Sequence, residues 1–286
     1  MSTVQHADVA ADARRELAND QARAERVAIM RRRRTSLKNF GIRMASLAIF
    51  LAIWQIGAMN VDPVLFTSPG KVAVAAVGMI ASGELWAGLW PSLLVLLMGL
   101  TLAIIFGTLL GLALARFPIL DVGLTVYITF LYSIPSVALV PLIVLWAGYE
   151  TTAKVIILFL FAFFPMVINT YQGVKSVDLK LLEVGRAFRC SERQLWANIV
   201  LPGALPFIVT GIRLALGRGL IGMVLADLYT AISGIGYLIV RSASTFQVDK
   251  MFVPIVTLGL LGVTLTALLR LAERYVAPWT AASQED

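Results

Sequence analysis

The chain has 286 residues, of which 59% are hydrophobic and only 14% are charged. Soluble domains are about half apolar and a quarter charged, so this composition excludes a soluble globular fold and favours a lipid environment. The net charge of +7 comes without the folded basic face and aromatic platforms of a nucleic-acid-binding protein, and with one cysteine and one histidine we expect no internal disulfide, no metal site and no cofactor.

The first 36 residues form a polar segment of mixed charge that includes a run of four arginines at 31–34. Two interpretations stay open: a disordered, solvated tail, or a helix that lies against anionic lipid headgroups. The segment is not a cleaved signal peptide, because the apolar run begins only near Met44 and no small-residue cleavage pattern follows a short apolar core. We expect residues 37–280 to form a transmembrane domain.

Six stretches are long and apolar enough to cross a bilayer, which takes about 20 apolar residues in a helix. They are 42–60, 91–115, 121–148, 153–174, 204–231 and 252–275. Between the first two, Thr67, Ser68 and Pro69 have the residue types of a helix start. The apolar stretch 72–80 that follows is too short to span, so we expect a helix at the membrane surface. The sequence therefore predicts an all-α bundle of about six transmembrane helices.

Lysine and arginine are distributed unevenly between the two sides of these spans. With an even number of spans, most of them fall on the same side as the N-terminus. The other side holds only Lys71, Lys154, Arg241 and Lys250. Positive charge accumulates on the cytoplasmic side of membrane proteins. We therefore expect a multi-pass membrane protein with both termini in the cytoplasm.

The segment 178–202 lies between the fourth and fifth spans and carries two short helical patterns. Asp178 can cap the first, and Ser191 with Gln194 can form a capping box for the second, which we expect to end at Pro202. Two short helices, each apolar on one side and charged on the other, make an elbow that projects from the membrane. From these residues alone, docking to a partner and simple capping of the bundle are equally good interpretations.

This elbow resembles the signature cytoplasmic loop of bacterial ABC importer permeases. The family pattern reads E-A-A, three residues, G, nine residues, I, any residue, L-P, and Glu183, Ile199, Leu201 and Pro202 match its spacing. Further blocks, in the same order along the chain, look like the nitrate, sulfonate and taurine branch of that family. These blocks are 66–69, 135–142, 211–215 and 234–239.

The chain departs from the family pattern at four positions. Val184 and Gly185 replace the two alanines, Arg189 replaces the loop glycine, and Asp227 replaces a glutamate that is usual in the fifth span. If the glycine position needs a left-handed backbone, a side chain there costs about 1–2 kcal/mol. By resemblance, the residues that couple the permease to its ATPase are Glu183, Gly185, Arg189, Ser191, Ile199, Leu201 and Pro202.

The resemblance implies a bacterial inner-membrane permease with several partners. A periplasmic solute-binding protein would deliver the substrate, a second permease copy would complete a homodimer, and a cytoplasmic dimer of ATP-binding subunits would receive the elbows. The chain is then not itself an enzyme, and it lacks a G-x-x-x-x-G-K-[ST] phosphate loop, since Val72 follows Gly70 and Lys71. The alternative is a secondary transporter or channel, which would need no such elbow.

The branch that the chain resembles carries small anions such as sulfonates, taurine and nitrate, and also vitamin precursors such as a pyrimidine. A small organic or inorganic anion is the expected substrate, and the vitamin precursor is the alternative. The solute-binding protein usually sets that choice.

Charged residues inside spans are rare and by default mark a transport pathway. Arg218 is nearest the middle of the fifth span, which favours the pathway, whereas Arg213 and Asp227 can equally lie near the membrane interfaces. Pro135 and Pro141 should kink the third span because each removes a backbone donor. Broken helices border substrate sites in some transporters, but transmembrane helices also tolerate proline for packing reasons, and both interpretations stay open. Stripes of small residues predict close helix packing at Gly107, Gly111, Gly211, Ala215 and Gly219.

Overall fold

A computed structural model describes residues 37–62 and 64–276 of the chain, and it divides into two units, residues 1–62 and 63–286. The described part of the first unit is one helix, Leu37–Met59, which is long and apolar enough to cross a membrane. The predicted tail 1–36 and the end of the predicted domain, 277–280, lie outside the described residues.

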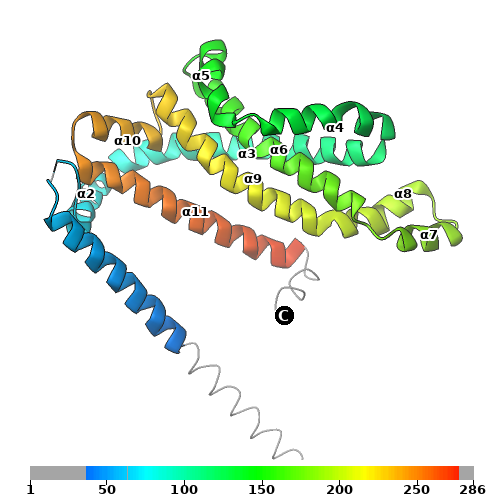
Figure 1. The fold of residues 1–286 in the computed structure, drawn as a ribbon, viewed down its shortest axis with the longest axis horizontal. Helices are drawn as coiled ribbons and strands as arrows, with labels where there is room; N and C mark the ends of the chain where they lie inside the picture. The colour runs from blue at the N-terminus through cyan, green and yellow to red at the C-terminus, as the bar shows by residue number, and fades with distance from the viewer. Residues whose placement is uncertain (1–36, 63, 277–286) are drawn as a thin grey trace, which may run out of the picture. The chain divides into compact units, whose positions relative to one another are not determined.

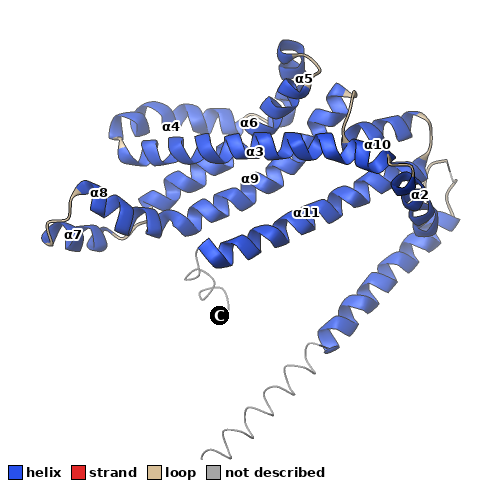
Figure 2. Cartoon of the chain, turned by 180° about the vertical axis from the view of Figure 1, so that it is seen from behind, coloured by secondary structure: helices blue, strands red, loops and turns tan. Residues whose placement is uncertain are grey.

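The second unit is built from helices joined by short connections (Figure 1). In chain order they are α2 (Pro69–Ala81), α3 (Glu84–Arg116), α4 (Pro118–Ser133), α5 (Ser136–Ala147), α6 (Thr151–Lys175), α7 (Leu179–Ala187), α8 (Glu192–Leu195), the π-helical turn η1 (Trp196–Val200), α9 (Leu201–Thr230), α10 (Ile235–Ser244) and α11 (Val248–Val276). Figure 2 shows helices and loops only, and the described residues contain no strand.

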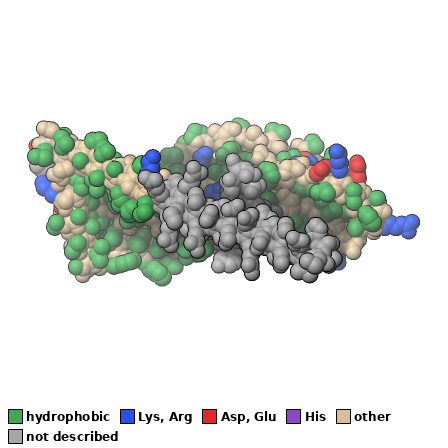
Figure 3. All heavy atoms as spheres, turned by 90° about the horizontal axis from the view of Figure 1, so that it is seen from below, with side chains coloured by type: hydrophobic (Ala, Val, Ile, Leu, Met, Phe, Trp, Pro, Cys, Tyr) green, Lys and Arg blue, Asp and Glu red, His purple; other side chains and the backbone are tan. Residues whose placement is uncertain are grey.

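The described residues contain five helices that are long and apolar enough to cross a membrane, or six if the bent pair α4 and α5 counts as one span. This confirms the predicted all-α bundle of about six spans. Figure 3 shows hydrophobic side chains over much of the visible surface, with acidic side chains mainly toward the end that holds α7 and α8. The helix α4 buries none of its side chains, and Ile119 and Val122 are more than four-fifths exposed. Such a surface suits hydrocarbon rather than water.

The core of the second unit is formed by α6, which packs against α3 on one side and α9 on the other (Figures 1 and 2). Ile157, Leu158 and Met166 of α6 are fully buried. The close approach depends on glycine: a Cβ added at Gly111 of α3 would lie 2.7 Å from both the Thr170 Cβ and the Val167 carbonyl oxygen. The prediction that the small-residue stripe around Gly111 serves helix packing is therefore confirmed.

The third predicted span is broken. The helices α4 and α5 meet at Ile134 and Pro135 with a bend of 94°. Pro135 is the N-cap residue of α5, where its missing N–H costs no helical hydrogen bond. Pro141 lies inside α5, which continues through it, so the expected kink there stays a prediction. One break, at Pro135, therefore redirects the whole segment.

The elbow continues into the membrane helix, whereas the sequence predicted an end at Pro202. The helices α8 and α9 join through η1 into one continuous helix, Glu192–Thr230. In η1 the N–H of Leu201 donates to the carbonyl of Trp196, five residues earlier. This wider turn makes room for Pro202, which would otherwise clash with the carbonyl four residues before it. The prediction of a helix end at Pro202 was wrong for this reason.

Besides the elbow, two short helices lie outside the spans. The helix α2 begins as predicted, because Ser68 is its N-cap and accepts a hydrogen bond from the N–H of Lys71. The helix α10 was not predicted. It begins after Gly234, whose φ of +109° favours glycine, and it buries Ile235, Gly236, Leu238 and Ser242.

Candidate functional site: the elbow and the buried polar network

The two helices of the elbow are capped as the sequence predicted. The side chain of Asp178 accepts a hydrogen bond from the N–H of Lys180 at 2.9 Å at the start of α7. At the start of α8, the Ser191 hydroxyl accepts from the N–H of Gln194, and the Gln194 side chain accepts from the N–H of Ser191 at 2.8 Å. Both caps satisfy backbone donors that have no partner within a helix. The fold of the elbow is therefore specified locally.

Arg189 lies at the turn between the two elbow helices in a left-handed conformation, with φ of +57°. The N–H of Cys190 donates to the carbonyl of Gly185 at 3.0 Å, and that of Arg189 donates to Arg186 at 2.9 Å. These two bonds form a Schellman motif, the usual helix end at which glycine is preferred. The position that holds glycine in the family pattern therefore has a left-handed backbone in this chain. Arg189 occupies it at a conformational cost of about 1–2 kcal/mol.

Gly185 brings the two elbow helices together. It is buried, and a Cβ added there would lie 2.5 Å from Leu195 Cδ2 and 3.1 Å from Ile199 Cδ1. The other face of α7 is free of such contacts: Glu183 and Val184 are exposed, and Phe188 is 80% exposed. The elbow therefore has an inner face held by Gly185 and an outer face of mixed apolar and acidic character.

Two ion pairs lie where the elbow meets the ends of the membrane helices. Arg116, the last residue of α3, lies 3.0 Å from Glu192 and also stands over the Trp196 ring, 5.7 Å from its centroid. Next to it, Asp121 of α4 lies 3.0 Å from the Lys175 ammonium at the end of α6. The first pair joins the elbow to α3, and the second joins α4 to α6; surface pairs of this kind contribute little to stability.

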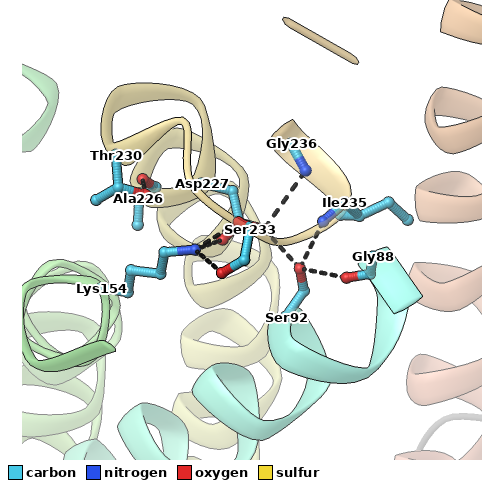
Figure 4. Close-up of polar contacts among 9 residues, drawn as sticks. All are labelled: Gly88, Ser92, Lys154, Ala226, Asp227, Thr230, Ser233, Ile235 and Gly236. Carbon is cyan, nitrogen blue, oxygen red and sulfur yellow. Dashed lines mark hydrogen bonds and ion pairs between the residues drawn. The ribbon is translucent and has the colours of Figure 1, made fainter. Parts of the chain in front are cut away.

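A buried polar network lies at the opposite end of the bundle (Figure 4). Lys154 of α6 and Asp227 of α9 form an ion pair of 2.8 Å, and their side chains are 3% and 0% exposed. The Lys154 ammonium also donates to the Ser233 carbonyl at 2.5 Å and to its hydroxyl at 3.2 Å. On the other side, Ser92 of α3 donates to Asp227 at 2.5 Å and accepts from the N–H of Ile235 at 2.8 Å. The network joins α3, α6, α9 and the start of α10.

The three charged residues of α9, all proposed from the sequence as pathway candidates, have different environments. Arg213 donates to both carboxylate oxygens of Glu273 in α11, at 2.9 and 2.7 Å, and Asp227 pairs with Lys154. Arg218 has no ion pair or hydrogen bond among the described residues. It lines a cavity of about 210 Å³ at the break between α4 and α5, together with Pro135. Pro141, inside α5, does not line this cavity.

Sequence reasoning missed the partners of these charges. Lys154 was placed on the outer side, at the start of the predicted span 153–174, and no partner was predicted for it. Ser92, Ser233 and Glu273 were not singled out. They carry no local signal, since each meets its partner across 60 residues or more in sequence: 135 for Ser92, 79 for Ser233 and 60 for Glu273.

The elbow, the membrane helices and the break between α4 and α5 can now be compared with known proteins. The model of the family described as "Binding-protein-dependent transport system inner membrane component" matches residues 103–281. An aliphatic sulfonates transport permease protein, SsuC, of Bacillus subtilis (strain 168) is 34% identical over 81% of this chain and 85% of its own length. Its namesake in Escherichia coli (strain K12) is 33% identical over 87% of this chain and 96% of its own length.

A formylaminopyrimidine transport permease protein, ThiX, of Halalkalibacterium halodurans is 31% identical over 81% of this chain and 92% of its own length. Among solved structures, an amino acid ABC transporter has a subunit that covers 70% of this chain and 98% of itself, with a TM-score of 0.57 and 17% sequence identity. At that identity the likeness concerns the fold.

These matches define the class of protein: a multi-pass permease subunit of an ATP-binding-cassette transporter in the inner membrane. The chain belongs to the family of binding-protein-dependent transport system inner membrane components. The resemblance that the elbow motif suggested is thereby confirmed.

Proposed function

We propose that this chain forms the translocation pathway of an importer for alkanesulfonates or related small organic anions. A periplasmic solute-binding protein delivers the substrate, and a cytoplasmic dimer of ATP-binding subunits drives transport through two copies of this permease. The substrate class is supported by the two sulfonate permeases among the relatives. The observation that carries the proposal is the elbow, a locally specified structure with one exposed face.

The exposed face of α7 has the form of a docking helix. Leu181, Val184 and Phe188 are all more than half exposed and recur at i, i+3 and i+7, so they share one side of the helix. Glu183 is exposed beside them and forms no ion pair among the described residues. An apolar stripe of this kind fits a hydrophobic groove in a partner, and an adjacent carboxylate gives orientation through a basic residue. We assign this role to the ATP-binding subunit.

The elbow then defines the sidedness of the permease. If α7 and α8 meet the ATPase, their end of the bundle is cytoplasmic, and the Lys154–Asp227 network lies at the periplasmic end. The even number of spans puts both termini in the cytoplasm, in agreement with the excess of lysine and arginine on that side.

The pathway is proposed to pass the break between α4 and α5, where Pro135 and Arg218 line the same cavity. Arg213 and Asp227 hold helices together through Glu273 and Lys154 and thereby shape the pathway without facing it. Pro141 is assigned a packing role inside α5.

The alternative substrate is a pyrimidine vitamin precursor, which the formylaminopyrimidine permease among the relatives favours. Uptake measurements separate the two. In proteoliposomes that hold the permease, its ATPase and its binding protein, we expect ATP-dependent uptake of an alkanesulfonate and none of a formylaminopyrimidine. The reverse result would support the vitamin precursor.

The first test is a pull-down of the tagged chain from its host membranes in mild detergent, with copurifying proteins identified by mass spectrometry. We expect an ATP-binding subunit, which is lost when α7 is replaced by a glycine-serine linker. Crosslinking of the same preparation should give a permease dimer. If a folded permease reproducibly copurifies with no ATPase, the proposal is wrong and a stand-alone transporter or channel takes its place.

A further inference from the structure

The fifth span carries a cation, Arg218, that forms no ion pair with any residue the structure describes. Arg218 is 17 residues from the start of α9 and 12 from its end, or about 26 Å and 18 Å along the helix, so it lies in the middle part of this span. The other two charged residues of α9 have intramolecular partners, Glu273 and Lys154. A charge at this depth is costly unless it is paired or faces water, so Arg218 requires a counter-charge or an aqueous cavity.

The surroundings of Arg218 provide the cavity. It holds about 210 Å³ and is lined by residues of α4, α5, α6 and α9. Pocket residues of two kinds meet there: apolar and aromatic ones such as Leu160 and Phe164, and the hydroxyl-bearing Tyr132 and Ser136. Among residues 37–62 and 64–276, no acidic one lines it. A cation would therefore be repelled, whereas a small anion with a short carbon chain would find both a charge and an apolar wall.

The start of α5 adds positive potential at the same place. Ser136 is the first residue of this 12-residue helix, and its N-cap, Pro135, offers no side-chain hydrogen bond to the first turn. The first N–H groups of a helix have no partner within it and carry a partial positive charge. Pro135 and Ser136 both line the cavity that contains Arg218. The arginine and the helix start therefore act on the same volume.

We propose that this cavity is an anion subsite of the pathway, in which Arg218 binds the sulfonate or carboxylate headgroup of the passing substrate while the aromatic wall holds its carbon chain. The proposal rests on the transport function proposed above and names the part of the substrate that the membrane subunit recognises. Discrimination between anions and neutral compounds then occurs in the permease as well as in the solute-binding protein.

The test uses the full-length permease in detergent or nanodiscs, without ATPase or binding protein, so that it does not depend on coupled transport. Cys190 is the one cysteine of the chain and is replaced by serine. In this background, Ser136→Cys places a thiol in the cavity, and Ser82→Cys places one at an exposed site at the end of α2. The rates of modification by an anionic and a cationic methanethiosulfonate of equal size are compared.

We expect the ratio of anionic to cationic rates to be about tenfold higher for Ser136→Cys than for Ser82→Cys, because a focused positive potential raises the local anion concentration by such factors. Adding Arg218→Gln should bring the ratio down to the Ser82→Cys value, and Arg218→Lys should keep most of it. An alkanesulfonate should slow modification, whereas the alcohol of equal chain length should not.

A ratio that is the same with arginine and glutamine at position 218, in folded protein, would overturn the subsite. So would a thiol at position 136 that reacts with neither reagent, since the cavity would then be closed to water. Charge selectivity without protection by the alkanesulfonate would overturn its role in substrate binding. Failure of the importer proposal would show separately, as a missing ATPase in the pull-down.

Discussion

The Lys154 ammonium and the Asp227 carboxylate lie 2.8 Å apart in the interior of the bundle, and both side chains are almost fully buried. The pair joins α6 to α9 and, through Ser233 and Ser92, to the turn before α10 and to α3. The position of Asp227 also explains why residues 234 and 236 are glycines. A Cβ at Gly234 would overlap the Asp227 carboxylate, and one at Gly236 would lie 2.6 Å from the Asp227 Cβ.

Loss of one member of this pair should destabilise the permease strongly. Asp227→Ala leaves the Lys154 ammonium buried without a counter-charge, for which we expect a loss of about 3 to 5 kcal/mol. The double variant Lys154→Met with Asp227→Leu should recover part of this loss, since it removes both charges. Unfolding in graded denaturant and detergent mixtures measures the effect. Equal stability of Asp227→Ala and the native chain would refute the assignment of the pair.

The left-handed turn of the elbow predicts a stabilising substitution. Arg189→Gly removes the steric cost of φ +57°, partly offset by the greater freedom of glycine in the unfolded chain, and should stabilise the turn by about 0.5–1 kcal/mol. Arg186→Gly, three residues earlier within α7, is the matched control and should destabilise by about 1 kcal/mol. Hydrogen exchange of the Cys190 amide, which bonds to Gly185, is the measurement. Faster exchange in Arg189→Gly would contradict the prediction.

The contact of α3 with α6 should tolerate no side chain at Gly111. Gly111→Leu places atoms where Thr170 and the Val167 carbonyl already lie, and overpacking of this kind costs about 1–3 kcal/mol or more. Gly123→Leu on α4 is the control, because a Cβ there has no neighbour within 4 Å. We expect a lower melting temperature in detergent for the first variant and little change for the second. Similar melting of both would mean that the helices are not in close contact.

Arg213 should act through Glu273. If its role is to tie α9 to α11, the charge reversal Arg213→Glu impairs folding and uptake, and the exchange Arg213→Glu with Glu273→Arg restores both. If Arg213 contacted the substrate instead, the exchanged protein would fold but would not transport. Uptake in proteoliposomes, together with the yield of folded protein, distinguishes these results.

Glu183 should matter for coupling but not for folding. Glu183→Lys reverses the charge on the exposed face of α7, and we expect uptake and ATPase association to fall by about tenfold or more, as for other charge reversals at an interface. Glu150→Lys is the control. Glu150 is exposed and lies before the first residue of α6, whereas the elbow follows the last residue of α6, so this variant should retain uptake and ATPase association. ATP-driven uptake at the native rate in Glu183→Lys would place the coupling contact elsewhere.

Features set by neighbouring residues were predictable from the sequence. Apolar length identified the spans, and the caps at Ser68, Asp178 and Ser191 follow from side chains that bond to backbone within three residues. The strain expected at Arg189 is also local, because helix termination fixes its backbone. These features involve no distant partner, so the residues next to them in the sequence are enough to predict them.

Features that depend on distant partners were not predictable. For Asp227 the sequence left a pathway position and an interface position equally open, and the fold pairs it with Lys154, 73 positions away. Pro202 looked like a helix end because the π-helical turn that accommodates it depends on the continuation of the helix beyond it. The start of α10 is held by Ser92, 143 positions earlier in the chain. Tertiary contacts decide the first and the last of these cases, whereas the turn before Pro202 is a local change in backbone hydrogen bonding.

The continuous helix from Glu192 to Thr230 has a mechanical consequence. At 39 residues it is a rod about 58 Å long, with the elbow at one end and Asp227 close to the other. A tilt of about 10° at the elbow would displace the far end by about 10 Å. Asp227 is connected to α3, α6 and the turn before α10, so such a tilt would strain the contacts of the buried ion pair. A movement of the elbow, the surface proposed for the ATP-binding subunit, would therefore also move Asp227 at the opposite end of the bundle.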